Sequence, residues 1–125
     1  MINIIVAVFL CVIPTVVYAI ELICEVEYAS VVTTLKPVAS FDPYETARID
    51  LPGNFRFSAH HLLDAGKLKT FVYHYAKDRY VLIHAAEYRV DKTECGQYEQ
   101  GFGLNKVYSA KVERELLFQC RSVCR

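Results

Sequence analysis

Four histidines are the side chains of this chain that most readily suggest a metal site or acid–base chemistry. They are His60, His61, His74 and His84. A zinc site needs three or four ligands that converge on one point. Adjacent residues of a strand point to opposite faces, so His60 and His61 cannot both face such a point. We therefore expect these imidazoles to be buried or at an interface with a hydrogen-bond partner, and we predict no metal and no cofactor.

Catalytic groups are present only as residue types, without the surroundings that catalysis requires. Ser58, His60 and Asp64 include the types of a catalytic triad, but no strained nucleophile turn surrounds the serine. Glu25, Glu27 and Glu87 could supply a glycosidase pair of carboxylates if two of them lie close together in space. Glu25 and Glu27 are more simply a solvated strand face that discourages edge pairing. The sequence therefore favours a binding protein over an enzyme.

The first part of the chain has the pattern of a secretory signal peptide over residues 1–19. Residues 4–13 form an almost unbroken apolar stretch that is too short for a stable membrane anchor. Small residues follow at the two positions that a signal peptidase reads, so we expect cleavage after Ala19. No basic residue precedes the apolar stretch. We expect residues 20–125 to be a single β domain, periplasmic or secreted, with no membrane association after cleavage.

The cysteines of the exported part predict disulfides. Cys24, Cys95, Cys120 and Cys124 are an even number in an oxidising compartment, which indicates two bridges. A bridge between the last two is awkward in extended chain, so we favour Cys24 with one of them and Cys95 with the other. Each long-range bridge adds about 2–4 kcal/mol to stability. Cys11 lies inside the signal, and the bulky residues before it argue against lipid attachment.

The charge balance limits the classes of partner. The chain carries fourteen basic and fourteen acidic side chains and has no formal net charge. A neutral chain of mixed charge does not attract phosphate backbones by its field. We therefore expect no nucleic-acid partner.

Short apolar segments separated by turn residues predict an all-β fold, a small antiparallel β-sandwich or meander braced by two disulfides. The clearest part is a meander of three strands at 55–63, 68–76 and 80–90, joined by turns at 64–67 and 77–79. The last two strands have apolar side chains on both faces. This pattern predicts a central position with something packed on each side.

The remaining elements follow the same logic. We expect strands at 22–34 and 44–51, and a loop or irregular hairpin over the glycine-rich residues 95–103. Strands at 104–109 and 111–120 complete the domain. The last segment has enough Glu, Arg and Leu for a helix, but the closing cysteines and the β context favour a strand.

Nine tyrosines make aromatic side chains the most telling part of the composition. We expect most to fill the core with their hydroxyls at its rim, Tyr73 and Tyr88 among them. Others can form a recognition surface, because tyrosine gives large rigid contact area at low entropic cost. In the 95–103 loop, Phe102 either projects to a partner or fills the end of the sandwich. The predicted partner-binding residues are Tyr98, Glu99, Gln100 and Phe102, followed by Lys67 and Lys69.

In its apolar segment 1–19, its size, its four mature cysteines and its meander at 55–90, the chain resembles bacterial periplasmic immunity proteins. These proteins neutralise the peptidoglycan-degrading effectors of the type VI secretion system. The resemblance is in general features over the whole chain and includes no specific motif. No site residue of these proteins can therefore be assigned to a position in this chain. The missing basic residues at the start depart from the bacterial signal pattern. The resemblance implies a small β-sandwich that inserts residues into the effector's substrate groove, with a homodimer as an open alternative.

Three functional hypotheses follow. The leading one is an exported inhibitor, or immunity protein, that occludes the substrate cleft of a secreted cell-wall-degrading hydrolase. The alternative is a secreted carbohydrate-binding or adhesion module, which predicts a flat aromatic face instead of a protruding loop. The third is a secreted effector or toxin-like protein that acts on a host.

Overall fold

A computed structural model of the chain describes residues 10–14, 20–90, 101–110 and 113–124. These residues form β-strands and a single 3-10 turn, η1 (Pro52–Asn54), and contain no α-helix. No helix that could cross a membrane occurs in the described ranges. The predicted cleavage site at Ala19 lies outside them. In chain order the strands are β1 (Ile20–Tyr28), β2 (Val31–Leu35), β3 (Val38–Ser40), β4 (Ala47–Leu51), β5 (Phe55–Leu62), β6 (Lys67–Ala76), β7 (Arg79–Arg89), β8 (Gly101–Tyr108) and β9 (Glu115–Cys124).

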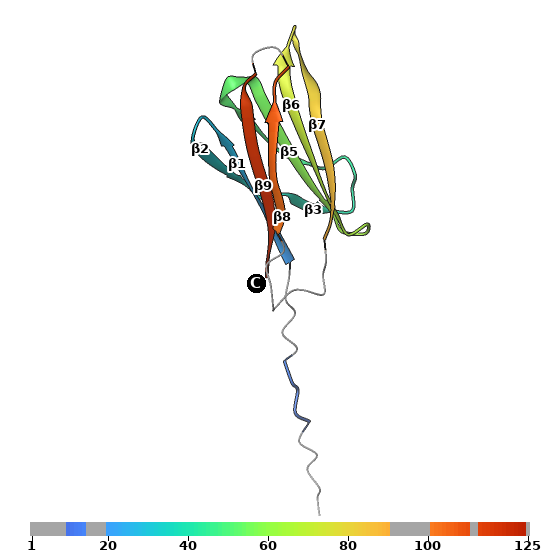
Figure 1. Cartoon of the computed structure of the whole chain (residues 1–125). Coiled ribbons are helices and arrows are strands. Elements are labelled where there is room, and N and C mark those ends of the chain that lie inside the picture. The colour runs from blue at the N-terminus through green and yellow to red at the C-terminus, as the bar shows by residue number, and fades with distance from the viewer. Residues whose placement is uncertain (1–9, 15–19, 91–100, 111–112, 125) are drawn as a thin grey trace, which may run out of the picture.

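The strands form two sheets that pack face to face (Figure 1). The first sheet has the order β2-β1-β9-β8, and all its strand pairs are antiparallel. Its two central strands, β1 and β9, come from distant parts of the sequence. The predicted strand at 111–120 is confirmed from Glu115 onward, and a helix is excluded there.

A disulfide joins the two central strands of this sheet. Cys24 and Cys120 lie opposite each other in the register of β1 and β9, with Cα atoms 4.0 Å apart. This is one of the two pairings favoured for Cys24. The expectation of two bridges is only partly met, because the described residues contain one disulfide. A bridge from Cys95 to Cys124 stays a prediction, since Cys95 and the Cys124 side chain lie outside the described part of the structure.

The second sheet contains the predicted meander, which is confirmed as β5, β6 and β7. On the other edge of β5, β4 pairs along one half and β3 along the other. The pairing of β3 with β5 is parallel, so the expectation of a purely antiparallel fold is wrong. The three-residue β3 lies just after Pro37 and has no hydrophobic pattern of its own to indicate it.

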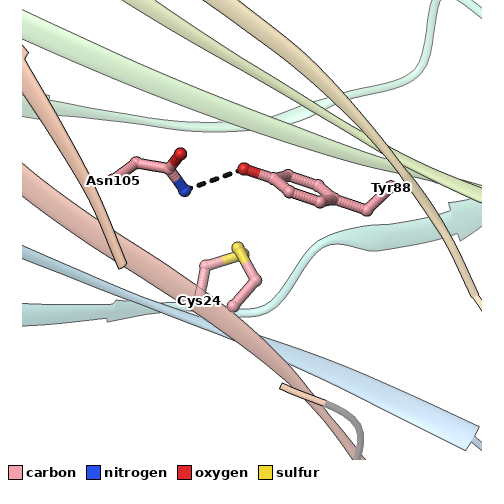
Figure 2. Close-up of a disulfide and its surroundings, with 4 residues drawn as sticks. Cys24, Tyr88 and Asn105 are labelled. Carbon is pink, nitrogen blue, oxygen red and sulfur yellow. Dashed lines mark hydrogen bonds between the residues drawn. A yellow bond between two sulfur atoms is a disulfide. The ribbon is translucent and has the colours of Figure 1, made fainter. Parts of the chain in front are cut away.

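The core lies between the two sheets. The rings of Phe57 on β5 and Phe118 on β9 have centroids 5.0 Å apart and join the sheets at its centre. Across β7 and β8, Asn105 Nδ2 donates a hydrogen bond of 2.8 Å to the hydroxyl of Tyr88, above the disulfide (Figure 2). The Tyr88 ring packs on the core while its hydroxyl has a polar partner, as predicted.

Two predicted features of the strands are corrected. The expected strand at 22–34 is a hairpin, because Ala29 and Ser30 turn the chain with positive φ values of 49° and 67°. Such turns usually contain Gly, Asn or Asp, so the sequence gives no turn signal here. The central position expected for the last meander strand is also wrong, since β7 is the edge of its sheet. The outward apolar side chains of β6 and β7 instead form a surface.

Candidate binding surface

The outer face of the five-stranded sheet, which points away from the core, carries the most distinctive surface of the described structure. On β6 the alternate residues Leu68, Thr70 and Val72 are completely buried and face the core. Because side chains alternate along a strand, Tyr73 and Tyr75 project from the outer face. We expected Tyr73 to lie in the core. It lies on the outer face, so this prediction is wrong.

Arg56 organises this face. It lies on β5 opposite Tyr73, and its Cζ is 3.8 Å from the centroid of the Tyr80 ring on β7. The same guanidinium donates two hydrogen bonds to Asp50 on β4, from Nε to Oδ1 at 2.6 Å and from Nη2 to Oδ2 at 3.2 Å. The hydrogen bond from Arg56 lowers the pKa of the Asp50 carboxyl below its usual value. The ion pair and the ring contact therefore fix a planar cation on the surface.

Aromatic rings and one leucine complete the surface. Tyr75 and Tyr80 meet edge to face, with centroids 5.1 Å apart and an interplanar angle of 70°. Leu82 lies opposite Tyr73 in the register of β6 and β7 and is 48% exposed, and Tyr75 is 41% exposed. We name this surface the aromatic face and define it as Arg56, Tyr73, Tyr75, Tyr80 and Leu82.

The aromatic face contains residue types that are common at protein interfaces. Tyr and Arg are enriched among the residues that dominate binding energy at protein interfaces. The contacts among them hold the side chains in place before binding, which reduces the entropic cost of association. A stack on a sugar ring needs an open and level aromatic platform. Here Arg56 covers one face of Tyr80, and Tyr75 stands at a steep angle to it.

Two of the predicted binding residues lie on the same outer face, toward the opposite end of β6. Lys67 and Lys69 both pair with Glu87 on β7, with Nζ–Oε distances of 3.6 Å and 3.3 Å. The hydrogen bond from Lys69 lowers the pKa of Glu87 most, and the charge of Lys67 adds to this. The structure thus gathers these two lysines into one cluster on the sheet that carries the aromatic face.

The other predicted binding residues belong to the segment before β8. Tyr98, Glu99 and Gln100 lie outside the described residues. Phe102 is in β8, where its ring lies 5.3 Å from the ring of Tyr88 and packs against the core. These contacts favour the alternative in which Phe102 fills the end of the sandwich, and its contact with a partner stays a prediction.

The histidines are distributed as the strand alternation requires. His60 and His61 are both buried, on opposite faces of β5. The expected hydrogen-bond partners are missing for His60 Nε2, His74 Nε2 and His84 Nδ1, which are buried without one. Among the described residues, no group of three or more His, Cys, Asp or Glu side chains is placed to hold a metal ion.

The sequence did not indicate Arg56, Tyr75 or Tyr80 as functional residues. The alternation of aromatic residues along β6 was visible, but which side faces solvent depends on how the second sheet packs. The contact of Arg56 with Tyr80 further requires the pairing of three strands. A comparison with known protein families, characterised proteins and solved structures finds no significant match.

Proposed function

We propose that this chain is an exported binding protein whose target is another protein. In particular, it acts as an immunity protein that inhibits a secreted cell-wall-degrading hydrolase by covering its substrate cleft. The observation that carries the proposal is the aromatic face, where Asp50 and Tyr80 hold Arg56 beside partly exposed tyrosines. A rigid Arg–Tyr surface on a sheet is suited to bind a protein with little loss of conformational entropy.

The polar groups around the aromatic face suit the cleft of a peptidoglycan hydrolase. Such a cleft binds a polysaccharide that bears anionic peptides, so an occluding surface needs hydroxyl and charged groups beside its aromatic rings. Tyr73, Tyr75 and Tyr80 supply hydroxyls there, and the Asp50 side chain is 59% exposed next to them. Lys67 and Lys69 provide a second set of contacts on the same face.

The disulfide supports the proposed location of the protein. The Cys24–Cys120 bridge is compatible with a periplasmic or extracellular environment, where disulfides persist. The apolar segment at 1–19 supplies the export signal in this proposal.

The experiment that tests the proposal combines capture with inhibition. The chain, tagged at its C-terminus, is recovered from the exported fraction, and stoichiometric partners are identified by mass spectrometry. The captured partner is then assayed for peptidoglycan hydrolysis with and without the pure protein. We expect a hydrolase whose activity falls in proportion to the added protein.

Matched variants locate the binding surface. The double variant Tyr75→Ala/Tyr80→Ala should weaken inhibition at least tenfold, since buried tyrosine anchors carry more than about 1 kcal/mol each. Tyr108→Ala on β8 is the control, because Tyr108 is also an exposed tyrosine but lies on the other sheet. The double variant Tyr98→Ala/Phe102→Ala tests the predicted loop in the same assay. Equal inhibition by the folded Tyr75→Ala/Tyr80→Ala variant and the wild type would exclude the aromatic face.

The same experiment also tests the alternative function, a carbohydrate-binding module. Binding of the pure protein to peptidoglycan or other insoluble polysaccharides, with no protein partner recovered, would replace the inhibitor proposal by a carbohydrate-binding module.

A further inference from the structure

The two outer faces of the sandwich carry opposite charge. Because side chains alternate along a strand, the register of the five-stranded sheet shows which of its charged residues point away from the core. Five of them are basic and two are carboxylates, so this outer face has a formal charge of +3. The basic residues are Arg48, Arg56, Lys67, Lys69 and Arg89. We call this surface, which includes the aromatic face, the basic outer face.

The outer face of the four-stranded sheet has the reverse balance. The charged strand residues that point outward there are four glutamates and two basic residues. They are Glu21, Glu25, Glu27, Glu115, Lys106 and Arg121. Lys36, just beyond β2, pairs with Glu21, and acidic side chains remain in excess. A chain with no net charge therefore presents its positive charge on the sheet that carries the aromatic face.

Asp50, one of the two carboxylates on the basic outer face, is shared by two cations. The hydrogen bond from Arg56 lowers the pKa of this carboxyl most, and the charge of Arg48 lowers it further. A guanidinium has five N–H donors, and two of those of Arg56 bind Asp50. The three side chains together keep one positive charge, which a carboxylate of a partner would neutralise.

Glu87 repeats this arrangement farther along the same face. Lys67 and Lys69 both pair with it, so these three side chains also keep one positive charge. Lys69 lies opposite His60 in the register of β5 and β6, four residues along β5 from Arg56. At 3.3 Å per residue the two cationic groups are about 13 Å apart. A partner that binds both groups therefore has acidic side chains at about this spacing.

We propose that the basic outer face docks on an acidic surface of its protein partner. Carboxylates of the partner form charge-assisted hydrogen bonds with the two cationic groups, while the tyrosines of the aromatic face supply contact area beside them. This inference rests on the proposed function, since it takes the partner at this face to be a protein, and it adds the chemistry of that partner. A cleft that cleaves glycosidic bonds contains carboxylates of its own.

The charge of the face disfavours the other occupants. In a two-fold dimer the same patch of both subunits meets, so a second copy bound through this face would bring two basic surfaces together. A nucleic acid is attracted by the field of many cations, whereas this face has two separate cationic groups on a neutral chain. An acidic protein surface complements both the charges and the tyrosines.

The first test uses the full mature chain and the hydrolase recovered by the capture experiment. Surface plasmon resonance measures the association rate constant as NaCl is raised from about 50 to 300 mM. We expect the rate constant to fall at least threefold over this range, because salt screens the attraction between complementary charges.

Matched variants assign the attraction to one face. Arg48→Gln/Lys69→Gln removes one cation from each cationic group and should lower the association rate constant several-fold at low salt. Lys106→Gln/Arg121→Gln is the control, because it removes the same number of cations from the opposite outer face. It should associate at least as fast as the wild type. Circular dichroism checks that both variants are folded, and Arg48→Gln alone replaces the first if that one fails to fold.

The second test applies if no partner is recovered. The mature chain is titrated with poly-L-glutamate and followed by two-dimensional amide NMR, with poly-L-lysine as the probe of opposite charge. We expect saturable shifts on β4, β5, β6 and β7 with poly-L-glutamate, and shifts on β1, β8 and β9 with poly-L-lysine. A single-stranded oligonucleotide is the competing probe. Its saturation of the same strands at a lower concentration of charged groups would overturn the assignment to a protein.

The outcomes separate this inference from the proposed function. A captured hydrolase whose association rate is unchanged by salt and by Arg48→Gln/Lys69→Gln would leave the proposed function standing and overturn the acidic partner surface. Without a captured protein the proposed function fails, and the poly-L-glutamate shifts decide the charge preference alone. Salt-sensitive self-association of the pure protein in sedimentation velocity would overturn the inference, because the acidic outer face of another copy would then be the occupant.

Discussion

Arg56 on β5 reaches over the position of Tyr73 on β6 and places its guanidinium on the ring of Tyr80 on β7. Because Asp50 on β4 binds Nε and Nη2 of the same group, a single side chain on β5 links β4 and β7 across the outer face. The surface proposed for binding is therefore built from side chains that already contact one another.

The ion pair predicts how Asp50 titrates. Replacing Arg56 by Gln removes the hydrogen bond that lowers the pKa of Asp50 most, so that pKa should rise toward its usual value. Carboxyl ¹³C NMR over pH 2–6 measures the change. Arg48→Gln is the control, because Arg48 has the weakest of the influences on Asp50 and should shift its pKa less. An Asp50 pKa that is the same in Arg56→Gln and wild type would contradict the observed pair.

The lysine cluster predicts a dependence of stability on pH. The pKa of Glu87 is lowered in the folded protein, so its contribution to stability is present above its usual pKa and is lost as pH falls through the lowered pKa. Lys69→Gln should reduce this loss more than Lys67→Gln, since the hydrogen bond from Lys69 is the larger cause. Urea unfolding at a series of pH values checks the order. Because the groups are exposed, added salt should diminish both effects.

We expect a side chain at Gly53 to destabilise the fold. Its φ is +78°, and an added Cβ would lie 2.4 Å from Cζ of Tyr28. Gly53→Ala should lower the free energy of unfolding by about 2 kcal/mol or more, since conformational strain and a clash add. Gly66→Ala is the matched control, because φ there is also positive but the nearest atom, Val90 O, is 3.8 Å away. It should cost about 1 kcal/mol. Equal losses in urea denaturation would rule out the clash with Tyr28.

The disulfide should contribute a large part of the stability. Cys24→Ala/Cys120→Ala removes a bridge between residues 96 apart in sequence, and we expect the free energy of unfolding to fall by about 2–5 kcal/mol. Equilibrium unfolding in urea measures it, with reduced wild-type protein as the comparison. A double variant as stable as oxidised wild type would show that the bridge adds nothing to the free energy of unfolding.

The second predicted bridge is tested by chemistry. Non-reducing peptide mapping of the protein purified under oxidising conditions should recover a fragment that links Cys95 to Cys124 besides the one that links Cys24 to Cys120. Alkylation of Cys95 or Cys124 in the unreduced, unfolded protein would disprove that pairing.

The parts of the fold that could be predicted are those with local signals. The meander could be predicted because its strands are rich in β-branched and aromatic residues and its turns contain Gly or Asp. The hairpin at Ala29 and Ser30 could not be predicted, since neither Ala nor Ser is typical of positions with a positive φ. The parallel pairing of β3 depends on β5, which follows it in the chain, and no local pattern encodes it.

The candidate site was harder to predict for a geometrical reason. Lys67 and Lys69 were identified, and they lie on the relevant sheet. On β7, however, a bulge shifts the register, so that Tyr73 pairs with Leu82 while Val72 pairs with His84. Simple alternation along the strand therefore assigns the residues after the bulge to the wrong face. Without that register, the contact of Arg56 with Tyr80 cannot be derived.

The neighbouring positions of β1 and β9 have a consequence for how the protein is made. The first sheet cannot assemble until the residues of β9 have been synthesised, because β1 has β2 as its only other partner in that sheet. A nascent chain that lacks β9 can therefore form only the β1–β2 hairpin of this sheet. The Cys24–Cys120 bridge, which spans 96 residues, can form only when synthesis of the chain is almost complete, and it then fastens the first strand of the sheet to the last.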